Sequence, residues 1–576
     1  MTMEPRSPFF AQPDFRPMRQ YEALRAYLHE GCSVEEAAER GGYTPGSFRN
    51  LLTRFRKNPS PFFFWPQPES SLSAVKPPDP RPAQILALRT EQGLTIYEIQ
   101  DALKKRKMPA SLGYIYGIFQ KENLPRLPRR AARTPRTVTA DRRKLDLSER
   151  SFHTEFAGLF LFAFDLARMG LDDILEQVGM PRTRMIPADC AVRSLLALKL
   201  SGIGRPSQVM AETLDQGLAL FAGLNAICKR TVLTEYSIQV DPTFAGPLMH
   251  RWYHAAAQLA DVVGTGASVD LDFHTIPYHG DQALLQKHFV SKRSRRQRGI
   301  LTMLARDAQA HVFCYADATL RKETQNDAIL EFVRDWKART GTLPGELVFD
   351  SRFTIYANLA VLDQMGIDFL TLRRRHAALV QKIHTLEPSA WTKIRLTNIG
   401  RAYRTPSIVD EIITLRTYPK PLRQLLVKNL GHDKPTVLIT NQMKRSPNQL
   451  IDRYARRMVI ENIISDAIDF FHMDALSSAV PMRINVDVQL TVMASVLYRL
   501  LGTRVAQGYE KAEARTLYRD LVRHSGKITI THDKILVHLR ARAKDNYLIA
   551  AQYPELQQNI PWLGNKTLQV QFAKRP

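Results

Sequence analysis

The amino-acid sequence predicts an α/β protein with a mixed β-sheet, preceded by smaller all-α units. Two short helical segments with capping signals come first, before residue 126. Strand-like and helix-like segments then alternate between residues 266 and 375, and a strand-rich tract and a long helical stretch follow. At about 100–200 residues per domain, a chain of 576 residues contains several domains.

The composition favours a folded protein that binds a polyanion. Apolar residues make up 44% of the chain, which is enough for a sizeable core. The net charge is +25, and a folded chain this basic usually contacts nucleic acid, with a merely basic surface as the alternative. The sequence has no CxxC pair, which disfavours a zinc finger or a disulfide framework and fits a reducing, cytoplasmic location. Its four cysteines are Cys32, Cys190, Cys228 and Cys314.

We expect no membrane association. The first residues, MTMEPRSPFFAQPDF, lack the charged-then-apolar order of a signal peptide. The most apolar run, FAGLFLFAFDLARMGL, is interrupted by Asp165 and Arg168 and is too short to span a bilayer. It predicts a buried helix.

The first helical unit, residues 1–58, has the order helix, short helix, turn, helix. The second helix opens at Ser33, with Glu36 placed to complete a capping box, and the third begins at Thr44 with Pro45 in the first helical position. This order predicts a helix-turn-helix unit. Its last helix carries the polar residues Ser47, Arg49, Asn50, Arg54, Arg56 and Lys57.

A second unit, residues 85–125, repeats the plan. Thr95 and Glu98 form another capping box, and Ser111 caps the last helix. Three-helix units also serve as protein-binding modules, but two in tandem on a basic chain favour DNA binding, with the last helix in a major groove. An arginine-rich linker follows, whose side chains contact phosphates or a minor groove, or only solvate the linker. The expected DNA contacts are Arg49, Asn50 and Arg54, with Arg129, Arg130, Arg133 and Arg136 from the linker.

From residue 266 the pattern changes to strands. Three strand-like segments are followed by helix, strand, helix and strand, which is the order of a mixed, RNase-H-like sheet. The segments are 267–277, two strands within 298–320, a helix at 321–341, a strand at 345–353, a helix at 354–366 and a strand at 367–375.

These patterns divide the chain into nine expected parts. They are a helix-turn-helix unit (1–58), a proline-rich linker (59–84), a second helix-turn-helix unit (85–125), a basic linker (126–150), a helical scaffold without a catalytic constellation (151–262), the first part of the RNase-H-like core (263–375), a β-rich insertion (376–446), the second part of the core (447–545) and a C-terminal tail (546–576).

Three carboxylates stand at informative places in these elements. Asp272 lies towards the end of the first strand, and Asp350 ends the apolar strand LVFD, which puts it at the carboxyl edge of the sheet, where ligands bind in open α/β sheets. Glu461 lies in the late helical stretch. Tyr454, Arg457 and Glu461 are spaced by three and then four residues, which sets them on one helical face.

Three carboxylates from separate elements suit a site with two Mg²⁺ ions, which prefer carboxylate oxygens and support in-line displacement at phosphorus. Each acid also has a simpler interpretation, since Asp350 could cap a helix and Glu461 could pair with Arg457. Asp270 is an alternative to Asp272, because the two residues face the same side of the strand about 7 Å apart. Asp270 could instead help to hold Asp272 in position, or contact water that is bound to the DNA.

The motifs VDLDFHTIP, LVFDSRF and Tyr454-x2-Arg457-x3-Glu461 resemble those of the DDE transposases of bacterial insertion sequences, in the IS4-like and IS1634-like group. The segment DFFHMDALSS after the glutamate also resembles that group. In this family a β insertion separates the second acid from the glutamate, here 111 residues apart at Asp350 and Glu461. The resemblance covers roughly residues 150–545.

The resemblance implies a DNA transposase. Asp272, Asp350 and Glu461 would be the catalytic, metal-binding residues for two Mg²⁺ ions, with Mn²⁺ as a substitute, and Tyr454 and Arg457 would contact DNA near the cut. The enzyme would bind terminal inverted repeats, hydrolyse a phosphodiester and join the freed 3′-OH to target DNA. It would act as a homodimer on double-stranded DNA in the bacterial nucleoid.

This chain departs from the family pattern at one position, and two alternative functions stay open. The family has a lysine seven residues after the glutamate, where this chain has Ile468. Either another cation takes over that contact or the contact is missing. A non-catalytic, transposase-derived DNA-binding regulator and an RNase-H-like nuclease without strand transfer are the alternative functions.

Further basic residues are candidates for DNA contact. The run SKRSRRQRG, between the first two strands, predicts a phosphate clamp beside the active site, with a solvated loop as the alternative. Arg373–Arg375 form a similar group. We expect His274 and His279 to pack or contact DNA, and Asp474 to be structural. The clamp residues are Lys292, Arg293, Arg295, Arg296 and Arg298.

Overall fold

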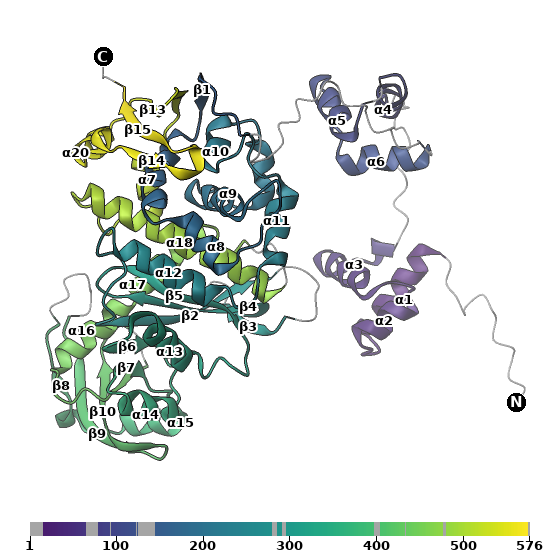
Figure 1. The fold of residues 1–576 in the computed structure, drawn as a ribbon. Helices are drawn as coiled ribbons and strands as arrows, with labels where there is room; N and C mark the ends of the chain where they lie inside the picture. The colour runs from purple at the N-terminus through teal and green to yellow at the C-terminus, as the bar shows by residue number, and fades with distance from the viewer. Residues whose placement is uncertain are drawn as a thin grey trace, which may run out of the picture. The chain divides into compact units, whose positions relative to one another are not determined.

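The computed structural model describes residues 15–573 in two units, Met1–Pro135 and Arg136–Pro576, apart from several internal segments (Figure 1). We call these the N-terminal unit and the large unit. Each has its own apolar core. The internal residues that the structure does not describe are 65–78, 93, 123, 125–144, 279–284, 291–294, 397–403, 432–433 and 476–479.

The N-terminal unit contains two groups of three helices. Both predicted capping boxes are confirmed: Ser33 and Thr95 each accept a hydrogen bond from the backbone of the glutamate three residues later, and that glutamate accepts from their own backbone. Thr44 and Ser111 cap the last helix of each group. The helices are α1 (Arg16–Leu28), α2 (Val34–Arg40) and α3 (Pro45–Lys57), then α4 (Arg81–Thr90), α5 (Ile96–Lys105) and α6 (Leu112–Lys121).

The large unit is built around a mixed sheet whose centre has the predicted element order. Strand β2 (Val269–Pro277) pairs antiparallel with β4 (Arg295–Asp307), which pairs antiparallel with β5 (Val312–Leu320). On its other side β2 pairs parallel with β6 (Glu346–Phe349), and β6 pairs parallel with β7 (Asp368–Leu372). Helices α13 (Ala328–Thr340) and α14 (Tyr356–Gln364) make the connections.

The strand-rich tract after β7 extends this same sheet. Strand β11 pairs antiparallel with β7, and β10, β9 and β8 continue outwards from it. A short strand that the sequence pattern did not predict, β3 (Lys287–Val290), pairs with β4. The added elements are α15 (Ala377–His384), β8 (Thr392–Lys393), β9 (Ser407–Leu415), β10 (Tyr418–Lys428) and β11 (Thr436–Thr440).

A helical layer packs on the sheet through α18 (Pro481–Val505), which contacts β5, α9 and α12 (Figure 1). Part of α18 is long and apolar enough to cross a membrane, but 83% of that window is buried inside the protein, as in a core helix. The predicted buried helix is α7, and its residues Phe160–Leu166 are all buried. The other helices are α7 (Phe160–Arg168), α8 (Leu171–Val178), α9 (Ala188–Leu200), α10 (Gln216–Phe221), α11 (Arg230–Gln239) and α12 (Ala245–Ala257).

A second sheet joins the start and the end of the large unit. Strand β1 (Arg150–Thr154) pairs with β12 (Gly526–Ile530), and β13 (Lys534–Leu539), β15 (Lys566–Phe572) and β14 (Gln558–Ile560) continue the sheet. Residues 546–576, which the sequence suggested to be a tail, therefore contribute two strands. Strand β15 pairs in parallel with β13, and this non-local pairing leaves no hairpin signal in the sequence.

The turn before β2 supports a prediction about Gly266. Gly266 has φ +72° and accepts a hydrogen bond at its carbonyl from Gly345, and a Cβ there would overlap the indole ring of Trp336. Gly266→Ala is expected to lower the free energy of unfolding by about 2–4 kcal/mol, from backbone strain plus overpacking. Chemical denaturation measures this change.

Gly341→Ala is the matched control. Gly341 has a similar φ of +75°, but nothing lies within 4 Å of its added Cβ. Gly341→Ala should lower the free energy of unfolding by only about 1–2 kcal/mol, which is the cost of backbone strain alone. Equal losses for the two variants would contradict the role given to the contact with Trp336.

Candidate active site

Two of the predicted carboxylates lie where the parallel pairing of β2 with β6 ends. Asp350 directly follows β6, but Asp272 is the fourth of the nine residues of β2 and does not lie towards the end of its strand as the sequence suggested, because β2 continues to Pro277 alongside β4. Leu271 pairs with Phe349 in the strand register, so the residues that follow each of them, Asp272 and Asp350, are level with each other. Asp350 Oδ1 accepts a hydrogen bond from the backbone N–H of Arg352 at 2.8 Å. Its backbone carbonyl accepts one from the Thr371 hydroxyl at 3.2 Å. These bonds fix the Asp350 turn against the end of β7.

The third carboxylate arrives on a helix pair. The sequence pattern predicted one continuous helical stretch, but the structure divides it at Met458 into α16 (Pro447–Arg457) and α17 (Val459–Asp469). Met458 donates its N–H to Ala455 instead of closing a full α-helical turn. Glu461 is exposed in the first turn of α17, a helix that contacts β2. A carboxylate in that turn is favoured by the helix dipole.

The three carboxylates are electrostatic neighbours. Burial raises the pKa of Asp272 to about 6, the Arg457 guanidinium opposes this shift, and the charges of Asp350 and Glu461 add to it. The Asp272 side chain is 17% exposed, and its Oδ1 accepts the backbone N–H of Phe273 at 2.9 Å. Asp350 and Glu461 are therefore near enough to Asp272 for their charges to affect its pKa.

Arg457 lies among these carboxylates. Its side chain is 6% exposed, its Nη1 lies 3.8 Å from Asp272 Oδ1, and it donates to the backbone carbonyl of Leu271 at 3.3 Å. Burial would lower the pKa of Arg457, but Tyr454 and the three carboxylates raise it above its usual range. The predicted DNA contacts Tyr454 and Arg457 thus line the carboxylate group, with the guanidinium 5.7 Å from the Tyr454 ring.

Asp270 lies in a different environment from Asp272. Its side chain is fully buried, and its two oxygens are each held by an arginine, Arg306 Nη1 at 2.6 Å and Arg453 Nη2 at 2.7 Å. Burial raises the pKa of Asp270, and the two arginines oppose the shift. Because both oxygens are already paired with guanidinium groups, we favour Asp272 over Asp270 as the first ligand.

The partners of Asp270 form a buried polar network that the sequence analysis missed. Arg453 Nε lies 2.7 Å from Glu346 Oε2 and also donates to the hydroxyl of Ser268. Glu346 in turn accepts from Arg445 and Gln442. Although burial raises the pKa of Glu346, these partners hold it below the usual value. The one sequence signal was the four-residue spacing of Arg453 and Arg457, which places both on one face of α16.

The remaining predicted DNA contacts are dispersed. In β4, Arg296 is exposed and Arg298 is half-buried. Leu304 of β4 is the strand partner of Asp272, and Arg298 lies six residues before it. Arg298 is therefore about 20 Å along the strand from the position of Asp272. On α3, Arg49, Asn50 and Arg54 are exposed. The side chain of Arg295 and the residues Lys292, Arg293, Arg129, Arg130, Arg133, Arg136 and His279 lie outside the described part of the chain.

Three further residues of the sequence analysis bond to the protein itself. Arg373 donates to the side chain of Gln424, Arg374 to the carbonyl of Ser351 and Arg375 to the carbonyl of Pro435. The second of these bonds ties the end of β7 to the Asp350 turn. His274 is half-buried in β2, and Asp474 lines a cavity at the C-terminal end of α17.

The donor set suits a hard divalent cation. Within the described ranges, no three His, Cys, Asp or Glu side chains stand close enough together to hold a metal ion. Mg²⁺, however, is usually bound by one or two carboxylates together with substrate phosphates, so a closed protein cage is not required. A bound cation would relieve the repulsion from Asp350 and Glu461 that adds to the effect of burial on the pKa of Asp272.

Residues 266–497 match the family model of the transposase DDE domain. The matched segment contains β2, β6, α16 and α17, and so all three carboxylates. The match supports a DDE transposase, a class of enzyme with an RNase-H-like core that cleaves DNA, transfers strands and generally uses divalent metals. No curated protein matches the chain.

The network around Asp270 leads to a stability prediction. Asp270→Ala leaves Arg306 and Arg453 without their shared anion, and breaking a buried ion pair in this way costs roughly 3–5 kcal/mol of unfolding free energy. Glu331→Ala, which removes an exposed pair with Arg334, should cost less than about 1 kcal/mol. Urea denaturation compares the two variants, and equal losses would contradict the assignment.

Replacing Asp272 should increase the stability of the protein, whereas replacing Asp270 should decrease it. The folded pKa of Asp272 lies above the unfolded value of 3.8, so its ionised form destabilises the fold above about pH 6. In metal-free buffer at pH 7, Asp272→Asn is expected to raise the unfolding free energy by about 1–3 kcal/mol. Asp261→Asn, at an exposed position, should change nothing. A loss of stability in Asp272→Asn would show that the carboxylate is structural.

Proposed function

We propose that this protein is a DNA transposase that recognises terminal inverted repeats, hydrolyses a phosphodiester at each end and joins the freed 3′-OH to target DNA. One observation carries the proposal. Asp272 in β2, Asp350 after β6 and Glu461 in the first turn of α17 are electrostatic neighbours inside a segment that matches the transposase DDE domain. A structural role alone gives no reason to bring three like charges near one another.

The carboxylates would hold two Mg²⁺ ions, or Mn²⁺, which supply charge stabilisation to the attacking and leaving oxygens. Water attacks the phosphorus atom first, the P–O3′ bond breaks, and a 3′-OH and a 5′-phosphate result. The 3′-OH then attacks a phosphorus of the target, displaces its O3′ and forms the new phosphodiester. Arg457, 3.8 Å from Asp272, would donate to a non-bridging phosphate oxygen.

The N-terminal unit is proposed to read the DNA ends. Helix α3 exposes Arg49, Asn50 and Arg54, which are side chains suited to phosphates and base edges. Cutting two ends together fits a homodimer assembled on DNA, and the net charge of +25 supports association with the nucleoid. The resemblance of its motifs supports membership of the IS4-like and IS1634-like group.

The proposal predicts that Asp350→Ala abolishes strand cleavage. Removing one member of a group of catalytic residues that act as a unit is expected to lower the rate on the order of 10³-fold or more. The assay uses DNA that carries the inverted repeats flanking the coding sequence, with Mg²⁺ or Mn²⁺. Sequencing gels of the products separate hydrolysis from strand transfer.

Asp368→Ala is the matched control, because Asp368 is exposed at the start of β7, on the opposite edge of the same sheet. It should retain cleavage and strand transfer. Specific binding without metal-dependent cleavage by the wild-type protein would favour a DNA-binding regulator. Cleavage without joined products would favour a nuclease.

A further inference from the structure

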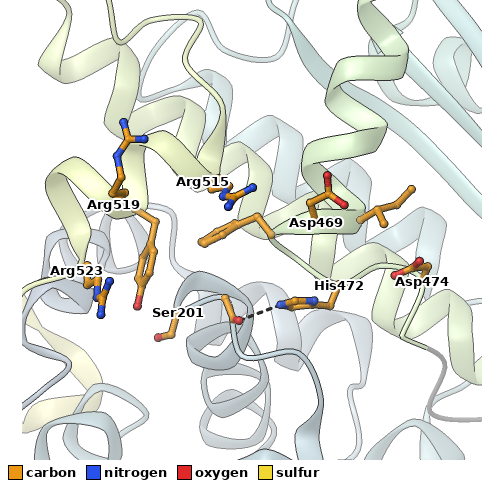
Figure 2. Close-up of a pocket in the computed structure, with 11 residues that line it drawn as sticks. Ser201, Asp469, His472, Asp474, Arg515, Arg519 and Arg523 are labelled. Atoms are coloured by element: carbon orange, nitrogen blue, oxygen red, sulfur yellow. Dashed lines mark hydrogen bonds between the residues drawn. The ribbon is translucent and has the colours of Figure 1, made fainter.

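A cavity of about 820 Å³ lies at the C-terminal end of α17 (Figure 2). Its walls come from the residues after α9, from the end of α17 and the loop behind it, from α19 (Ala514–Leu517) and from the π-helical segment η8 (Tyr518–Val522). The charged or titratable side chains on these walls include Asp469, His472, Asp474, Arg515, Arg519 and Arg523.

The three arginines follow one another at intervals of four residues and are all exposed. A π-helical turn, a feature frequent at functional sites, lies between the first arginine and the last. Arg519 pairs with Asp520 at 2.7 Å. Across the described residues, the guanidinium groups of Arg515 and Arg523 have no carboxylate partner. Two of the three guanidinium groups at the cavity are therefore available to an anionic ligand.

The two acids stand apart from the arginines. Figure 2 shows Asp469 and Asp474 on one side of the cavity and Arg515, Arg519 and Arg523 on the other. Asp469 accepts a hydrogen bond from the Ser465 hydroxyl at 3.1 Å. His472, between the two walls, bonds through Nε2 to the carbonyl of Gly202 at 3.0 Å. An anionic ligand would therefore be held along the arginine wall.

Helix α17 connects this cavity to the carboxylates. Glu461 is in its first turn, and Ile468 lines the cavity seven residues later, two turns along the same side. Seven residues of α-helix rise about 10 Å. A DNA strand carries one phosphate per roughly 3.4 Å of axis, so a strand bound at Glu461 has about three phosphates over that distance.

We propose that Arg515, Arg519 and Arg523 form a phosphate-binding wall for the DNA strand that runs from the active site along α17. This inference rests on the proposed function. The family has a lysine where this chain has Ile468. Because the three arginines line the same cavity as Ile468, they could supply the positive charge of that lysine. The ligand of the wall is the sugar-phosphate backbone, and the wall carries no base specificity.

The test measures how salt weakens binding of the full-length protein to a fluorescein-labelled duplex of arbitrary sequence. Each neutralised phosphate contributes about 0.9 to the slope of log K against log salt concentration. The triple variant R515Q/R519Q/R523Q should therefore have a slope less negative by about 2 to 3. The triple lysine variant keeps the charges and should keep most of the wild-type slope.

A second triple variant, R182Q/R184Q/R230Q, removes the same charge from three exposed arginines that do not line the cavity. Its slope should stay close to that of the wild type. The proposal is overturned if the glutamine variant of the cavity keeps the wild-type slope, if the control loses as much, or if the lysine variant loses as much.

Strand cleavage by the wild-type protein is measured in parallel. Absence of cleavage, with the slope change intact, would remove the proposed function and leave the DNA-binding wall.

Discussion

The arrangement of the site depends on the ion pairs of Arg453, whose side chain is 13% exposed. Arg453 pairs with Asp270 of β2 and Glu346 of β6 and so fixes α16 across the two central parallel strands. One helical turn later Arg457 meets Asp272, and the break at Met458 then starts α17 with Glu461 in its first turn. A buried ion pair adds little net stability, but it penalises every other placement of the helix, because a shifted helix leaves charges buried and unpaired.

The same network explains how the chain returns to the site after a long excursion. Between Asp350 and Glu461 the chain adds β11, β10, β9 and β8 to the edge of the sheet beyond β7. After β11, Gln442 and Arg445 both bond to Glu346 at the start of β6. The entry to α16 is thus tied to the central strand before Arg453 docks. The insertion separates the acids in sequence without moving them apart in the fold.

The sequence predicted those features that depend on local chemistry. The capping boxes at Ser33 and Thr95, the strand order around β2 and the position of Asp350 at a strand end follow from short-range patterns. The break at Met458 did not, because the residues on both sides of it are compatible with one helix. The pairing of Asp270 with two arginines could not be predicted either, since it needs the non-local register of β2, β4 and α16. For the same reason the strand pattern alone did not separate the two neighbouring aspartates, and only the motif favoured Asp272, although one is paired with two arginines and the other faces like charges.

The central proposal is that Asp272, Asp350 and Glu461 together bind the catalytic metal ions. The most direct measurement replaces Mg²⁺ with Fe²⁺ and maps the cuts that hydroxyl radicals, formed at the bound iron, make in the polypeptide. The account predicts cuts close to residues 272, 350 and 461 of the folded, DNA-bound protein, all suppressed by excess Mg²⁺. Cuts confined to one of these segments, or located elsewhere in the chain, would contradict it.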